Sequence, residues 1–224
     1  MAMAPLLNIS DIFSVSNTLF SIGGNTVSLL ETCSVLLGLV TVFLAARGKS
    51  YNYWFGYIYN ISLFILFFQK SLYASMILQP IAFSIAVYGH YQWTHPKKGK
   101  ENNKHELKVT LLSWSERLMY IMILIAFTLL WGFIIKYLHS SWPETFSPDP
   151  NAFLDAGGVG LILLAQFLSA KKKLDCWALW LIVDITNIIL YIQAGLSFMP
   201  IVSAAYFFLA GFGFIAWRKT WKNQ

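Results

Sequence analysis

Long apolar stretches separated by short polar segments make up most of the chain. Seven such stretches can be marked, and their residue ranges are 28–46, 53–69, 75–93, 118–138, 153–170, 176–193 and 198–217. Each matches the ~17–25 residues that an α-helix needs to cross a bilayer. The pattern therefore predicts an all-α membrane protein with seven transmembrane helices joined mostly by short loops.

The basic residues gather in alternate loops. If the helices alternate in direction, one set of loops holds Lys70 and Lys136, and the other holds the remaining 14 of the 16 lysines and arginines. The members of the larger set are Arg47, Lys49, Lys97, Lys98, Lys100, Lys104, Lys108, Arg117, Lys171, Lys172, Lys173, Arg218, Lys219 and Lys222. Loops rich in lysine and arginine stay in the cytoplasm. The sequence therefore predicts an N-terminus outside the membrane and a cytoplasmic C-terminus.

Composition agrees with a membrane location. Hydrophobic residues make up 57% of the chain and charged residues 12%, about half the ~25% of a soluble domain. The net charge of +6 comes from loops at one membrane face. There it sets the orientation and meets anionic lipid, so we expect contacts with membrane lipid and none with nucleic acid. Residues 8–20 are expected to form either a short interfacial helix or a partly ordered tail.

The sequence matches itself when it is shifted by 124 residues. Residues 30–93, the first unit, align without a gap with residues 154–217, the second unit, and 19 of the 64 aligned positions are identical. Because one helix lies between the two three-helix units, both have the same orientation. This predicts a 3+1+3 parallel-repeat arrangement with stretch 118–138 as the linker. Transporters built from parallel repeats bind substrate between the repeats near the membrane midplane.

The same pattern divides the chain into seven segments. They are an outside N-terminal segment (1–27), the first repeat (28–93), a basic cytoplasmic connector (94–117), the linker helix (118–138), an outside loop (139–152), the second repeat (153–217) and a basic cytoplasmic tail (218–224). The chain has no Gly-x-x-x-x-Gly-Lys-Ser/Thr, Gly-x-Ser-x-Gly or His-Glu-x-x-His motif. Cys33 and Cys176 fall near opposite ends of different stretches and indicate no metal site. We therefore expect no enzyme activity, no metal and no cofactor.

Polar side chains within the apolar stretches are the candidate ligand-binding groups. An ionisable residue at bilayer depth costs ~2.5–3.5 kcal/mol, and Asp184 lies near the middle of the sixth stretch. At helical spacing it shares a stripe with Trp177, Trp180, Asn187 and Tyr191. The stripe suits a flat aromatic ligand, because indole rings stack on it and a carboxylate accepts hydrogen bonds or balances a positive charge. The alternatives are an aromatic belt for the two tryptophans and a structural hydrogen bond between helices for Asp184.

The first unit contributes four further candidates. Asn60 is the repeat mate of Asp184 and lies at the same depth in the second stretch. Tyr53, Gln79 and Tyr88 are added because they are polar or aromatic side chains within the first unit's stretches. These residues and the stripe would together face a ligand between the two units.

Two stretches carry a family resemblance. The first runs from Asn52-Tyr53-Trp54-Phe55-Gly56 to Tyr88-Gly89-His90-Tyr91-Gln92-Trp93, and the second is Trp177-Ala-Leu-Trp180-Leu-Ile-Val-Asp184. The second is similar to the Trp-x-x-Trp-x-x-x-Asn signature of the Pnu family of bacterial vitamin transporters. The chain resembles this family along nearly its whole length.

The resemblance implies a fold similar to that of the SWEET sugar transporters. It also implies uptake of nicotinamide riboside across the bacterial inner membrane by facilitated diffusion, with a kinase trapping the vitamin inside and no ATPase partner. Trp177, Trp180 and position 184 carry over as substrate contacts. Asp184 departs from the asparagine of the signature, and relatives thought to move thiamine make that cation the alternative substrate.

Two other mechanisms stay open at this point. One is a proton-coupled symporter with Asp184 as the proton carrier, and the other is a substrate-binding subunit of a larger pump. Whether the protein forms a homo-oligomer is also left open by the sequence.

Overall fold

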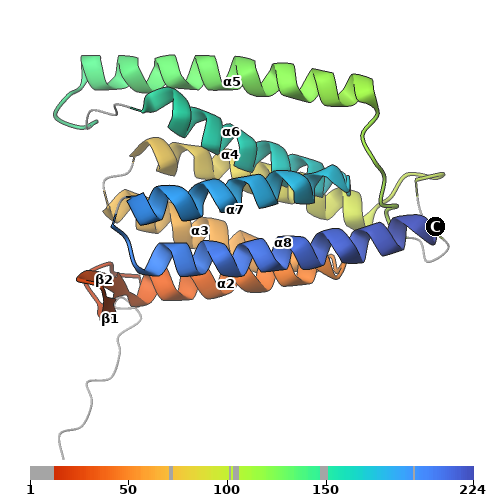
Figure 1. The fold of residues 1–224 in the computed structure, drawn as a ribbon, viewed down its shortest axis with the longest axis horizontal. Helices are drawn as coiled ribbons and strands as arrows, with labels where there is room; N and C mark the ends of the chain where they lie inside the picture. Colours follow the sequence, from red (N-terminus) through yellow and green to blue (C-terminus); the bar gives the residue numbers. More distant parts are fainter. Residues whose placement is uncertain (1–12, 71–72, 101, 103–105, 147–150, 194) are drawn as a thin grey trace, which may run out of the picture.

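The structure is a computed structural model that describes residues 13–70, 73–100, 102, 106–146, 151–193 and 195–224. Within these residues seven long helices run alongside one another (Figure 1). They are α2 (Leu29–Ala46), α3 (Asn52–Gln69), α4 (Tyr73–Thr94), α5 (Trp114–Ser141), α6 (Ala152–Ala170), α7 (Asp175–Gln193) and α8 (Phe198–Lys222). Each helix lies over one of the predicted apolar stretches. The prediction of seven helices is therefore confirmed.

Five helices, α2, α5, α6, α7 and α8, are long and apolar enough to cross a membrane by length and composition. Helix α3 is less apolar because it contains several tyrosines and the polar residues Asn52, Asn60 and Gln69. Asn52 and Asn60 are buried, so the polar side of α3 faces protein. Helix α5 is the opposite case, since large side chains such as Met122 and Leu130 are mostly exposed along it. Its apolar surface is suited to lipid.

Capping residues set the start of two helices. Ser28 caps α2 and Ser113 caps α5, and each serine hydroxyl accepts a hydrogen bond from the backbone N–H of the glutamate three residues later. The glutamates, Glu31 and Glu116, bond back to the serine N–H. This capping box satisfies N–H groups that a helix start leaves unpaired. Because of it, α5 begins at Trp114, before its apolar stretch begins.

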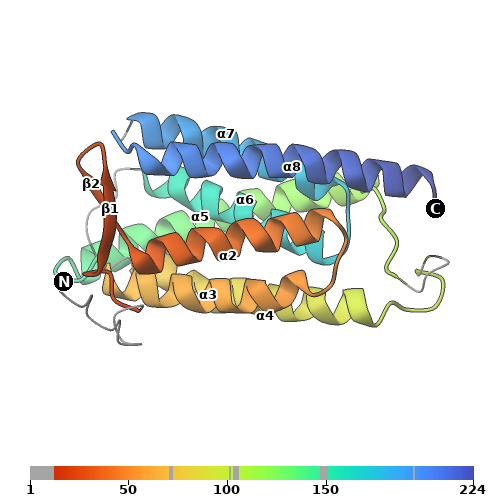
Figure 2. The same cartoon turned by 90° about the horizontal axis from the view of Figure 1, so that it is seen from below.

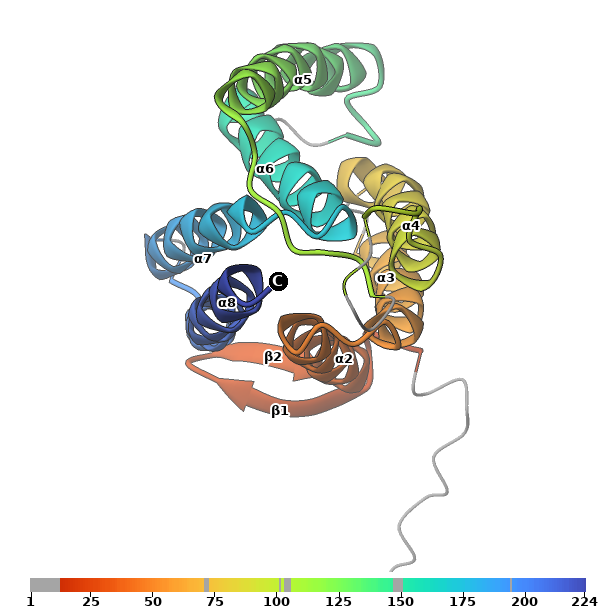
Figure 3. The ribbon, with the colours of Figure 1, turned by 90° about the vertical axis from the view of Figure 1, so that its right-hand side faces the viewer.

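Six helices form a closed ring, and α5 lies outside it (Figure 3). Around the ring the neighbours are α2, α3, α4, α6, α7 and α8, and α8 contacts α2 again. Helix α5 packs on α6. The first unit supplies α2, α3 and α4 and the second supplies α6, α7 and α8. The units therefore meet at two seams, α2 with α8 and α4 with α6.

The two ends of the bundle differ in what they carry. One end, here named the basic end, holds the α2–α3, α4–α5 and α6–α7 connections and the C-terminus (Figure 2). The described members of the larger basic set lie in these segments or in the helix turns next to them. The opposite end, here named the hairpin end, holds the N-terminal strands.

The N-terminal segment contains a β-hairpin that the apolar pattern did not predict. Strand β1 (Thr18–Ile22) pairs antiparallel with β2 (Asn25–Ser28). Gly23 and Gly24 connect them, with φ angles of 57° and 82°. Glycine adopts positive φ without steric cost, so Gly-Gly between two short strands is a turn signal in the sequence.

This hairpin corrects one expectation. Apart from its two strands the described fold is helical, but the interfacial helix, one of the two alternatives for residues 8–20, is wrong where it reaches β1. Residues 8–12 lie outside the described residues. The hairpin is held at its end of the bundle by Phe20, whose ring packs edge-on against Phe198 of α8 at 5.5 Å between centroids.

Candidate substrate site

Helix α7 turns its polar and aromatic stripe toward the other helices. Within the stripe, Asp184 and Trp177 are buried and the other three residues are half-buried. The opposite face carries Ile182, Ile185 and Ile189, which are all exposed. The helical spacing in the sequence therefore identified the inward face of α7 correctly.

Asp184 is a buried carboxylate that has no hydrogen-bond or ion-pair partner among the described residues. The residue is 5% exposed, and within the described chain no side chain or backbone group hydrogen-bonds or ion-pairs with it. Among the described side chains, Trp177 Nε1 is the one polar atom that is both sealed from solvent and unbonded. The Asp184 oxygens are not among such atoms, so they are not completely sealed from solvent. A charge at this depth is costly unless it is paired, so the carboxylate is available to a cationic ligand.

Asn60 lies at the matching depth in α3. Its Nδ2 donates a hydrogen bond to the Gly56 carbonyl at 2.8 Å, one turn back in the same helix. Its Oδ1 accepts no hydrogen bond from the part of the chain that the structure describes. The repeat thus places an amide on one unit and a carboxylate on the other, each with a free acceptor.

Two tyrosines that the sequence analysis missed join this region. Tyr59 of α3 and Tyr206 of α8 interact through their phenol groups, and Tyr206 also interacts electrostatically with Asp184. Both rings lie against Gly38 of α2, where a Cβ atom would overlap the Tyr206 hydroxyl and come within 3.1 Å of Tyr59 Cε2. Tyr191 of α7 is close enough to act on Tyr59 electrostatically. The structure therefore places the Tyr59–Tyr206 pair within electrostatic range of Tyr191 and Asp184.

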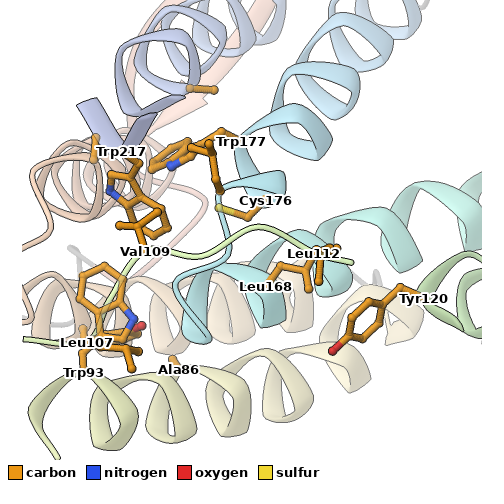
Figure 4. Packing of buried hydrophobic residues seen from close by; sticks show 14 residues of the cluster. Ala86, Trp93, Leu107, Val109, Leu112, Tyr120, Leu168, Cys176, Trp177 and Trp217 are labelled. Carbon is orange, nitrogen blue, oxygen red and sulfur yellow. The ribbon is translucent and has the colours of Figure 1, made fainter. Parts of the chain in front are cut away.

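Trp177 packs into an aromatic layer nearer the basic end. Its indole is 2% exposed and meets Trp217 edge-on at 5.3 Å between centroids (Figure 4). A Cβ atom at Gly213 would come within 2.5 Å of the Trp177 ring, so only glycine leaves room for it there. Trp180 is partly buried against the same cluster.

The first-unit candidates are spread more widely. Tyr53 is buried and stacks on His90 at 5.5 Å between centroids. Tyr88 is exposed and stacks on Phe167 of α6 at 5.9 Å. Gln79 is half-buried, and its Nε2 donates to the Ser75 carbonyl at 3.2 Å. No described contact joins these three side chains to Asp184.

A family comparison decides the class of protein. Residues 28–219 match the model of the nicotinamide mononucleotide transporter family. The chain belongs to this family. The matched segment contains both units and the helix between them, and the relatives described below are named as transporters, so this family member is a multi-pass membrane transporter and not an enzyme. The resemblance to the Pnu transporters is confirmed.

Individual relatives cover most of this family member. It is 31% identical over 236 residues to the nicotinamide riboside transporter PnuC of Escherichia coli (strain K12), which covers 96% of this chain and 97% of the relative. It is 26% identical over 183 residues to the riboflavin/roseoflavin transporter RibM of Streptomyces davaonensis, covering 81% of each chain. A crystal structure of the vitamin B3 transporter PnuC shares the fold, with a TM-score of 0.66 at 24% identity over 87% of this chain and 82% of that one.

Proposed function

We propose that this protein takes up nicotinamide riboside across the bacterial inner membrane by facilitated diffusion. The observation that carries the proposal is the buried carboxylate of Asp184, which has no hydrogen-bond or ion-pair partner among the described residues, in a chain that is similar to a nicotinamide riboside transporter over 96% of its length. Nicotinamide riboside is a pyridinium cation, and a buried carboxylate without a partner is complementary to it. Phosphorylation inside the cell would then keep the vitamin from leaving.

The proposed site lies at mid-depth beside Asp184. The pyridinium ring would lie against Trp180, since indole faces attract flat cations. Trp177, which lies in the aromatic layer, would support the pyridinium ring from the basic end. The ribose hydroxyls and the carboxamide would bond to the free acceptor of Asn60, to Asn187 and to the phenols of Tyr59, Tyr191 and Tyr206. Tyr53, Gln79 and Tyr88 stay in the proposal as contacts made when the units move.

The topology proposed for transport follows from the charge at the two ends. The basic end is assigned to the cytoplasm by the positive-inside rule, and the hairpin end and N-terminus to the outside. The two units would rock about the central site, exposing it to each side in turn, as in other parallel-repeat transporters. Because α5 lies outside the ring, it would act as the linker of a SWEET-like 3+1+3 arrangement. No ATPase partner is required by this scheme.

Thiamine is the second candidate substrate. Its thiazolium ring is also cationic, and Asp184 stands where the nicotinamide riboside signature has asparagine. A relative named for riboflavin transport also supports variation of the vitamin within the family.

Uptake by purified protein in liposomes tests the proposal. Labelled nicotinamide riboside is expected to equilibrate across the membrane without ATP or an ion gradient and to be competed by the unlabelled vitamin. Protein-free liposomes and an excess of thiamine are the controls. Uptake that requires an inward proton gradient would replace facilitated diffusion with symport. The absence of uptake for a protein that binds the vitamin would point to a subunit of a larger pump.

A further inference from the structure

The two units are joined at the basic end by a reciprocal pair of hydrogen bonds. Trp93 Nε1, at the end of α4, donates to the Ser169 carbonyl of α6 at 3.2 Å. Trp217 Nε1, near the end of α8, donates to the Ala45 carbonyl of α2 at 3.1 Å. The shift of 124 residues relates Trp93 to Trp217 and also Ala45 to Ser169. Each unit therefore donates one bond and accepts one across the two seams.

The same tryptophans close the space between the seams. The two indoles lie 5.7 Å apart between centroids, and both are buried (Figure 4). Trp177 extends the layer on the Trp217 side and Tyr53 on the Trp93 side, where its ring meets Trp93 edge-on at 5.4 Å. The layer therefore consists of two repeat-related pairs of aromatic side chains, which fill the space inside the ring of helices at this depth.

A segment of the α4–α5 connector, residues 106–113, crosses the basic end of the ring of helices (Figure 3). Leu107, Val109 and Leu112 are buried in the same cluster as the tryptophans. The segment is tied to the second unit, because the Thr110 N–H donates to the Lys172 carbonyl at 3.1 Å and the Leu112 N–H donates to the Asp175 carboxylate at 2.9 Å.

Lys172 breaks the repeat symmetry at the centre of this end. Its repeat mate is Gly48, and both have positive φ, 54° for the lysine and 70° for the glycine. A lysine in this conformation carries a steric cost that glycine does not. Its side chain crosses to the first unit, with Nζ 4.7 Å from the centre of the Trp93 ring, and is buried. The cation therefore covers the indole that joins the units.

We propose that Trp93 and Trp217 form the cytoplasmic gate of the transporter, closed here, with residues 106–113 and Lys172 as its cover. The inference rests on the proposed function only in assigning the basic end to the cytoplasm. Opening toward that side requires the seams to separate there, and both tryptophan bonds cross a seam, so they must break together. Because the bonds are repeat-related, the gate opens by symmetric movement of the two units.

The two native cysteines report on the gate. Cys176 is fully buried within the aromatic cluster, and Cys33 is half-buried near the hairpin end of α2. With Cys33→Ser as background, the rate at which a small maleimide labels Cys176 in the purified protein measures opening of the basic end. Labelling needs no substrate, so its result is independent of which vitamin is carried.

Trp93→Phe combined with Trp217→Phe keeps an aromatic ring at each position and removes both donors. A buried hydrogen bond contributes a factor of about five to an equilibrium of this kind, so labelling of Cys176 should accelerate at least about tenfold. Each single variant should show a smaller increase, which keeps the test available if the double variant does not fold. Trp221→Phe, one turn further along α8 on an exposed tryptophan, is the matched control and should label like the parent.

Two results would overturn the proposal that Trp93 and Trp217 form a gate. One is an unchanged Cys176 rate in the folded double variant. The other is an equal acceleration of Cys33, measured in a Cys176→Ser background, because that would mean general loosening rather than opening at one end.

Discussion

Asp184→Asn is expected to remove the protein's preference for the charged form of nicotinamide riboside. Two opposite charges ~4 Å apart attract by about 4 kcal/mol at an effective dielectric constant of ~20, and desolvation offsets part of this. The wild-type protein should therefore bind the pyridinium cation about 10-fold to 100-fold more tightly than the uncharged dihydropyridine form. The two forms share the ribose and the carboxamide and differ in ring charge. Because Asp184 has no protein partner within the described chain, its replacement leaves no other charge unpaired.

Titration calorimetry with both forms measures this preference directly. In Asp184→Asn the affinities for the two forms should become similar, chiefly because the cation binds less tightly. Glu144→Gln, the same chemical change at an exposed glutamate between α5 and α6, should keep the wild-type preference. If Asp184→Asn still binds the cation tenfold more tightly than the uncharged form, a residue other than Asp184 recognises the charge of the ligand ring.

Gly38→Ala is expected to weaken substrate binding at least about tenfold while leaving the protein folded. The new methyl group would overlap the Tyr206 hydroxyl. That hydroxyl is the far end of a flexible side chain, so Tyr206 can turn away, and the Tyr59–Tyr206 pair would then separate. Alanine is favoured over glycine within a helix by ~1 kcal/mol, which offsets part of the overlap. The loss should therefore appear in the dissociation constant more than in the unfolding temperature.

Gly211→Ala is the matched control for this variant. It makes the same exchange in α8, where a Cβ atom would meet nothing within 4 Å. Calorimetry and thermal unfolding of both variants separate the two effects. Equal substrate affinity in Gly38→Ala and Gly211→Ala would show that the Tyr59–Tyr206 pair does not contribute to substrate binding.

The apolar and charge patterns of the sequence predicted most of the fold. Seven helices were predictable because each must supply an unbroken apolar length, and the inward face of α7 followed from its spacing around Asp184. The hairpin was missed because a search for apolar stretches passes over two short strands of mixed polarity, although Gly23-Gly24 marked the turn. The start of α5 was misplaced because Ser113 and Glu116 cap it before its apolar stretch begins.

The residues of the proposed site were predictable only in part. Asp184 and Asn60 stood out as polar groups at matching depth in the two units. Tyr59 and Tyr206 did not, because their repeat mates are Val183 and Ala82, and a comparison of the units selects positions that agree. Sequence spacing also could not show that the Trp177 indole packs against Trp217. This contact joins two helices and depends on how the helices pack into their closed ring.

The substrate is tested most directly by titration calorimetry of the purified wild-type protein with nicotinamide riboside, with thiamine and riboflavin in parallel. The protein is expected to bind nicotinamide riboside saturably at one site per chain, and to give weaker or no heat with the other two vitamins. Binding of thiamine or riboflavin without binding of nicotinamide riboside would exclude nicotinamide riboside as the substrate.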